Sequence, residues 1–93
     1  MKKVWIEQGV IWALIPESQD GFRKVVKKAK QDIYVTSGGE GDHIAESFHY
    51  SGRAWDMRKS GFTAVGLRKV LGAKWDVVQY SWGFHCELDR LVF

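Results

Sequence analysis

Two short segments of this chain alternate apolar and polar side chains, which is the pattern of a β-strand with one buried face. In "GRAWDMR" (52–58), Trp55 and Met57 fall on one face. The opposite face carries Ala54, Asp56 and Arg58. The pattern indicates a sheet that covers a core on one side and presents polar groups on the other.

The second segment repeats this division near the end of the chain. In "GFHCELD" (83–89), His85 and Glu87 share one face, and the apolar side chains share the other. If the two strands pair so that their apolar faces join one core, Asp56, His85 and Glu87 meet on the far side of the sheet. His49 enters the same region from the loop before the first of these strands. We therefore predict a polar cluster built from distant parts of the sequence.

His49, Asp56 and His85 form a ligand set that suits one Zn²⁺ ion. Three protein ligands leave the fourth tetrahedral position to water, as in catalytic zinc sites, whereas structural sites are closed by four ligands and often by cysteines. The single cysteine, Cys86, lies on the apolar face, so we expect no thiolate site and an inert side chain. Nitrogen and carboxylate ligands also accommodate Fe²⁺, Co²⁺ or Mn²⁺, so the metal itself stays open.

The remaining segments predict the fold class. Apolar residues at helical spacing follow Pro16 and Gly61, and Ser18 or Asp20 can cap the first helix. We predict helices at 16–31 and 61–73, a strand or hairpin at 4–15, and strands at 32–39, 53–58, 75–81 and 84–93. Without regular β-α-β alternation, this order predicts an α+β fold: a small, mainly antiparallel sheet with two helices packed on one face and the zinc site on the other.

The 93 residues predict a single domain, 1–93, and the 45% apolar composition is sufficient for a core. One cysteine excludes an intrachain disulfide. No apolar run approaches the roughly 18 residues of a membrane span. The start, "MKKVWIEQGVIWALIPE", is interrupted by Glu7 and Gln8 and carries no cleavage site of the secretory type, so we expect a protein that is cytoplasmic where it is made.

A net charge of +3 favours anionic partners without selecting one. Five cations fall on the outer face of the first predicted helix: Arg23, Lys24, Lys27, Lys28 and Lys30. With Trp and Tyr available for stacking they permit nucleic-acid binding. No recognised nucleic-acid motif accompanies them, so we expect a solvated helix face and no nucleic-acid partner.

"SFHYSGRAWD" (47–56) matches, without a gap, the pattern Ser-x-His-x-x-Gly-x-Ala-x-Asp. The chain thereby resembles the zinc D-alanyl-D-alanine carboxypeptidases and related peptidoglycan endopeptidases, which share their metal site with lysostaphin-type enzymes and the Hedgehog amino-terminal domain. "TSGGEGDH" (36–43) is similar to the family's loop before the first ligand, and "LGAKWDVVQYSWGFHCELD" (71–89) to its closing hairpin. The resemblance covers roughly residues 33–90. It implies an α+β fold with zinc held by His49, Asp56 and His85.

The chain departs from the family pattern just before His85. The family usually carries an Asp or Glu three residues before this ligand, as general base, and many relatives have a His two residues before it. Trp82 and Gly83 occupy these positions here. The acid two residues after the ligand is present as Glu87. The metal ligands are therefore complete in the sequence, while the usual base is missing.

Glu87 is the candidate for the catalytic carboxylate, because it shares a face with His85 and lies about 6–7 Å along the strand. The alternative is that Glu87 orients a ligand histidine. Glu40 or Asp42 can serve as the base if their Gly-rich loop folds over the site.

Three further residues are candidates for substrate binding: His43, Ser47 and Arg58. Arg58 can hold a substrate carboxylate, with an exposed ion pair as the alternative. His43 can contact substrate or replace the missing site histidine, with a plain loop residue as the alternative. Ser47 is expected to form hydrogen bonds within the ligand loop.

The resemblance implies a zinc metallopeptidase that cuts peptide bonds of bacterial cell-wall peptidoglycan, as a D,D- or L,D-type carboxypeptidase or endopeptidase. Its compact size is similar to that of phage-borne, endolysin-like members, which a phage lysis partner can release to the wall. We expect a monomer or small homo-oligomer with a peptidoglycan peptide as partner. Two alternatives stay open: a catalytically silent metal-binding module that binds a peptide or other ligand, and a small basic nucleic-acid-binding protein.

Overall fold

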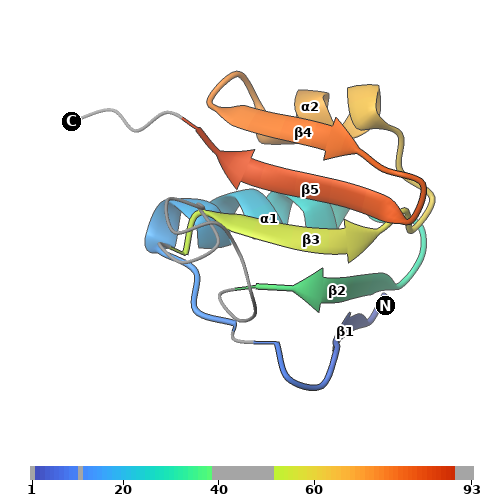
Figure 1. Cartoon of the computed structure of the whole chain (residues 1–93). Coiled ribbons are helices and arrows are strands. Elements are labelled where there is room, and N and C mark those ends of the chain that lie inside the picture. Colours follow the sequence, from blue (N-terminus) through green and yellow to red (C-terminus); the bar gives the residue numbers. More distant parts are fainter. Residues whose placement is uncertain (1, 11, 39–51, 90–93) are drawn as a thin grey trace.

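The fold is a five-stranded sheet with two helices (Figure 1). The computed structural model describes residues 2–10, 12–38 and 52–89. The strands are β1 (Val4–Ile6), β2 (Ile33–Ser37), β3 (Ala54–Arg58), β4 (Trp75–Gln79) and β5 (Gly83–Leu88), and the helices are α1 (Pro16–Lys28) and α2 (Ala64–Leu71). Neither helix of these described segments is long and apolar enough to cross a membrane.

The strands lie in the order β1-β2-β3-β5-β4 (Figure 1). β3 pairs antiparallel with both β2 and β5, and β5 pairs antiparallel with β4. β1 alone among these strands is parallel to its neighbour, β2. A small α+β fold with a mainly antiparallel sheet is therefore confirmed. The first predicted strand is much shorter than expected, since β1 ends at Ile6 and the Val10 amide then donates to the Glu7 carbonyl in a turn.

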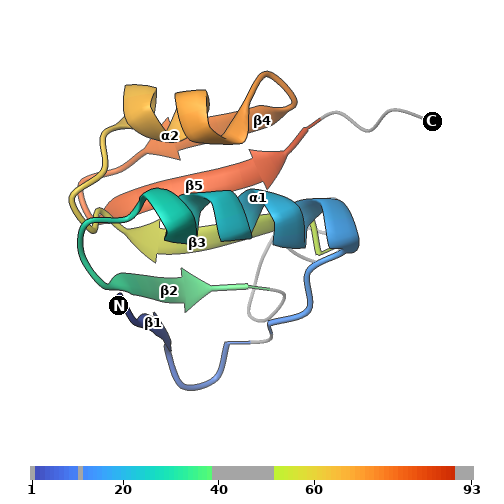
Figure 2. The ribbon, with the colours of Figure 1, turned by 180° about the vertical axis from the view of Figure 1, so that it is seen from behind.

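The core is built on one face of the sheet. Trp55 and Met57 of β3 and Phe84 and Cys86 of β5 have no exposed surface, as the alternation predicts. The helices add Phe22, Val25, Leu67 and Leu71 to the same cluster. Figure 2 shows the ribbons of both helices in front of the strands, in the view from behind. Burial raises the pKa of the Cys86 thiol, which fits its expected inertness.

The helix ends follow local rules. Pro16 occupies the first turn of α1, where its fixed φ suits the helix and its missing N–H is not needed. The predicted caps are wrong for this reason: Ile15 is the N-cap residue, while Ser18 and Asp20 lie inside the helix. In α2 the Thr63 hydroxyl caps the helix by accepting from the Gly66 amide at 3.0 Å.

A glycine brings α1 against the aromatic part of the core. A Cβ at Gly21 would overlap the ring of Trp75. That ring lies 5.0 Å from the ring of Trp55, centroid to centroid, and Phe22 packs edge-on against Trp55 at 5.1 Å. The seating of α1 on the sheet therefore depends on the absence of a side chain at position 21.

We expect Gly21→Ala to lower the free energy of unfolding by about 1–3 kcal/mol, the usual cost of overpacking. The higher helix propensity of alanine would by itself raise the free energy of unfolding by about 0.5–1 kcal/mol. Urea unfolding followed by Trp fluorescence measures the change. Gly66→Ala is the control, because its added Cβ meets only the Thr63 hydroxyl, at 3.1 Å. A Gly21→Ala protein as stable as wild type would contradict the packing described.

Candidate functional site

Asp56 and His85 face each other across the β3–β5 pair. They are direct partners in the antiparallel register, and His85 Nδ1 lies 2.8 Å from Asp56 Oδ1. Both belong to the sheet face opposite the core, here called the site face, which carries Ala54, Asp56, Arg58, His85 and Glu87. The two side chains are only 18% and 16% exposed, so water screens their interaction weakly.

Glu87 contacts the other nitrogen of the same ring. Its Oε1 lies 2.7 Å from His85 Nε2, as expected for residues two apart on one strand face. The imidazole is thus held between two carboxylates. The structure brings Asp56, His85 and Glu87 together as the alternation predicts.

The two carboxylates favour the protonated ring. The hydrogen bond with Asp56 is the largest influence and raises the pKa of His85, burial opposes it, and the bond with Glu87 raises the pKa further. A protonated imidazole donates to both carboxylates, whereas the neutral ring donates from one nitrogen only.

The pair fits a metal site in part. Ligand atoms about 2.0–2.2 Å from a tetrahedral zinc lie about 3.3–3.6 Å apart, so Nδ1 and Oδ1, now 2.8 Å apart, would have to separate by about 0.5–0.8 Å. Within residues 2–10, 12–38 and 52–89, no three His, Cys, Asp or Glu side chains are grouped to hold a metal. Asp56 and Glu87 contact different nitrogens of one ring and do not converge on one point.

The third predicted ligand, His49, lies outside the described residues, as do the candidate substrate contacts His43 and Ser47. The same holds for the loop carboxylates Glu40 and Asp42. Their roles stay predictions.

The two positions that depart from the family pattern lie in and beside the β4–β5 turn. A Cβ at Gly83 would collide with the Met57 carbonyl oxygen, so this backbone leaves no room for a histidine there. Trp82 is 47% exposed, and its ring stacks on Tyr80 with 5.1 Å between centroids and 5° between planes. Strand alternation does not assign Trp82 to either face of the sheet, because this residue lies in the turn.

A hollow of about 330 Å³ opens beside the Asp56–His85 pair. Its lining comes from β2, β3 and the turn: Thr36, Ser37, Asp56, Arg58 and Trp82. Arg58 is exposed on the site face, as expected, with its guanidinium carbon 5.3 Å from the centre of the Tyr34 ring. Thr36, Ser37 and Trp82 were not among the predicted site residues; their only sequence signal is their position next to the predicted loop and turn.

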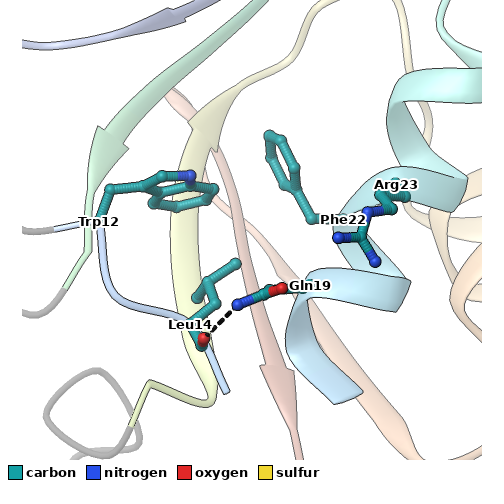
Figure 3. Close-up of a pocket in the computed structure, with 5 residues that line it drawn as sticks. All are labelled: Trp12, Leu14, Gln19, Phe22 and Arg23. Atoms are coloured by element: carbon teal, nitrogen blue, oxygen red, sulfur yellow. Dashed lines mark hydrogen bonds between the residues drawn. The ribbon is translucent and has the colours of Figure 1, made fainter. Parts of the chain in front are cut away.

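A second hollow, of about 260 Å³, lies beside α1 (Figure 3). Trp12 and Phe22, which line it, pack edge-on at 4.8 Å. Its polar side chains already have partners: Gln19 Nε2 donates to the Leu14 carbonyl at 2.9 Å, and Arg23 pairs with Asp20 at 2.9 Å. This hollow therefore belongs to the packing of residues 12–15 against the helix. The five basic residues predicted for the outer face of α1 and its end are all exposed.

No protein-family model, curated protein or solved structure matches this chain. The function of the site must therefore be inferred from the motif at 47–56 and from the geometry around His85.

In the metal-free protein we expect the pKa of His85 to lie above 6.5, the ordinary value, because both ring nitrogens meet carboxylates. The resulting stabilisation is fully present below about pH 6.5 and is lost as the pH rises through the raised pKa of the folded protein. An NMR titration of the His85 ring measures the pKa, with His85→Gln to identify the signal. Asp56→Asn should lower it more than Glu87→Gln does; a value at or below 6.5 in wild type would contradict the hydrogen bonds described.

Proposed function

We propose that this chain is a zinc-dependent peptidase that hydrolyses peptide bonds of bacterial peptidoglycan. One observation carries the proposal: the motif at 47–56 and the closing hairpin separately supply Asp56 and His85, and these side chains meet at 2.8 Å on the site face. Both are expected ligands of the same ion. Two polar residues without a shared role would have no reason to pair directly in this way.

His49, Asp56 and His85 would hold the ion. When bound, it supplies Lewis-acid chemistry to the scissile carbonyl and to the attacking water. For His85 to act as a ligand through Nδ1, its proton must reside on Nε2. Glu87 Oε1 lies 2.7 Å from Nε2 and would accept that proton, as carboxylates beside ligand histidines commonly do. This contact supports Glu87 as a positioning residue rather than the general base.

Hydrolysis also needs a group that takes a proton from water and later gives one to the leaving amine. With Glu87 engaged at His85 and Trp82 in place of the family's acid, we assign this role to a carboxylate of the Gly-rich loop, Glu40 or Asp42. The absence of the family's acid at position 82 also favours a second candidate function. Without a base, the chain would be a metal-binding module that binds wall peptide and does not cut it.

We expect the purified protein to bind one equivalent of Zn²⁺ and His85→Ala to lose it. Glu87→Gln should weaken the affinity by about 10–100-fold, the usual effect of removing the partner of a ligand histidine. Asp76→Asn is the matched control, because Asp76 is the direct β4 partner of Glu87 but is exposed, and the hydrogen bonds described for His85 go to Asp56 and Glu87 instead. Metal analysis measures the zinc content, and competition with a chelator measures the zinc affinity. Equal zinc binding by wild type and His85→Ala would remove the proposed site.

We expect the zinc-loaded protein to shorten or separate muropeptides, detected by mass spectrometry, and His85→Ala to leave their masses unchanged. Trp82→Glu restores an acid at the family position, and general acid–base catalysis contributes about 10²–10⁴-fold to rates. Cleavage by Trp82→Glu but not by wild type would identify the silent module. Intact muropeptides with both proteins, at full zinc occupancy, would overturn the peptidase proposal.

A further inference from the structure

β1 lies at one edge of the sheet and has only β2 beside it among the described strands (Figure 1). The Lys3 carbonyl accepts from the Ile33 amide at 2.9 Å, and the Glu7 amide donates to a carbonyl of β2 at 3.0 Å. Lys3 and Glu7 therefore turn these backbone groups toward β2. Because the backbone groups of successive strand residues point to opposite edges, those of Val4 and Ile6 point away from β2. They form an edge to which another strand can be added.

The opposite edge of the sheet, β4, is protected. The Arg68 guanidinium donates to the Val77 carbonyl at 2.8 Å. Tyr80 and Gly83 exchange the hydrogen bonds of the β4–β5 pair, so Val77, three residues earlier, turns its carbonyl to the outer edge. A charged side chain at an edge hinders the addition of a further strand. The ribbons of both helices lie over β3, β5 and β4 and not over β1 (Figure 2), so β1 is the open edge of the described sheet.

The open edge is also apolar. Val4, Trp5 and Ile6 are 36%, 50% and 42% exposed. Trp5 is the register partner of Tyr34 and lies with it on the site face, whereas Val4 and Ile6 lie on the core side of the sheet. An exposed apolar edge strand is a template for pairing with another chain. Pairing at this edge would remove all three side chains of β1 from water in part.

The sequence of this edge is complementary to itself. If two copies of β1 pair antiparallel about a two-fold axis at Trp5, Lys3 of each copy lies opposite Glu7 of the other. Val4 of each copy then lies opposite Ile6 of the other, and the two residues can exchange both backbone hydrogen bonds through the groups that point away from β2. A register centred one residue earlier or later would put Lys3 or Glu7 opposite Trp5 instead. Opposite charges and aromatic rings that face each other directly stabilise antiparallel pairs.

We propose that this chain forms a two-fold dimer in which the β1 strands of two copies pair antiparallel and join their sheets into one. The occupant of the edge is a second copy, because the charges and the backbone groups match when the same sequence lies on both sides. The assembly is closed, since each copy uses its open edge and Arg68 occupies the other. The two-fold axis is perpendicular to the sheet, so both site faces lie on the same side. The inference does not depend on the proposed peptidase function.

Sedimentation equilibrium of the purified chain should give twice the mass of one chain. Lys3→Glu and Glu7→Lys each replace the two attractive pairs of the dimer by like-charge pairs, and each should raise the dissociation constant about tenfold or more. A mixture of the two variants should regain dimers, because each reversed charge then meets an opposite charge. This recovery separates a changed interface from a damaged strand. Asp76→Lys is the matched control, because it reverses an exposed charge on the protected strand β4, and it should dimerise as wild type does.

A cross-link locates the interface. Trp5→Cys would put two thiols directly opposite each other, where Cα atoms lie about 4.5–5.5 Å apart, within the roughly 4.4–6.8 Å of disulfides. Oxidation with diamide should therefore link the chains, as read on a non-reducing gel. Tyr34→Cys is the matched control, because its two copies lie about 14 Å apart, three strand spacings, and should stay unlinked. The native Cys86 is buried and does not compete.

Three results would each overturn the proposal. The first is a wild type that stays monomeric at millimolar concentration. The second is a dimer whose dissociation constant is unchanged by both charge reversals. The third is equal linking through positions 5 and 34, which would put the contact between copies at another surface.

Discussion

The site depends on the register of one strand pair. In β3 and β5, Trp55 pairs with Cys86 and Met57 with Phe84 on the core face, which puts Asp56 directly opposite His85 on the site face. All four core side chains are fully buried, and complete burial of a large apolar side chain contributes about 1.5–3 kcal/mol. A slip of β5 by one residue would move Phe84 and Cys86 to the site face and turn His85 and Glu87 into the core. Core packing therefore holds the polar cluster in place.

The sequence is sufficient to predict the faces of these strands, because side-chain alternation is a local property. It does not predict partners that depend on distant segments: nothing in "VWI" indicates that β1 lies parallel to β2. The N-cap of α1 was missed because the rule for Pro16 outweighs the capping preference of Ser18 and Asp20. Similarly, alternation puts Glu87 near His85 but does not say which ring nitrogen it meets, and that contact changes its interpretation from base to positioning residue. The place of Trp82 in the lining of the hollow was not predicted, because a turn residue belongs to neither strand face.

The two carboxylates at His85 would have opposing effects on the metal binding that we propose. They raise the pKa of the ring, so a proton competes with a metal for Nδ1 at low pH, and binding must release it. In the proposed site, once that proton has left, Glu87 would hold the remaining one on Nε2 and leave the lone pair of Nδ1 for the metal. The proposed site would therefore bind a metal weakly under acidic conditions and more tightly under neutral and basic ones.

The departure from the family pattern follows from the tight β4–β5 connection. Tyr80 and Gly83 exchange backbone hydrogen bonds around two residues, and the Gly83 backbone lies so close to the Met57 carbonyl that a side chain is excluded. The close approach of β3 and β5 that aligns Asp56 with His85 is therefore incompatible with a histidine at position 83. Position 82 is not constrained in this way, since its side chain is exposed at the rim of the hollow. The aromatic residue there lines the hollow and has no group for proton transfer, so the proposed peptidase would require its base from another segment.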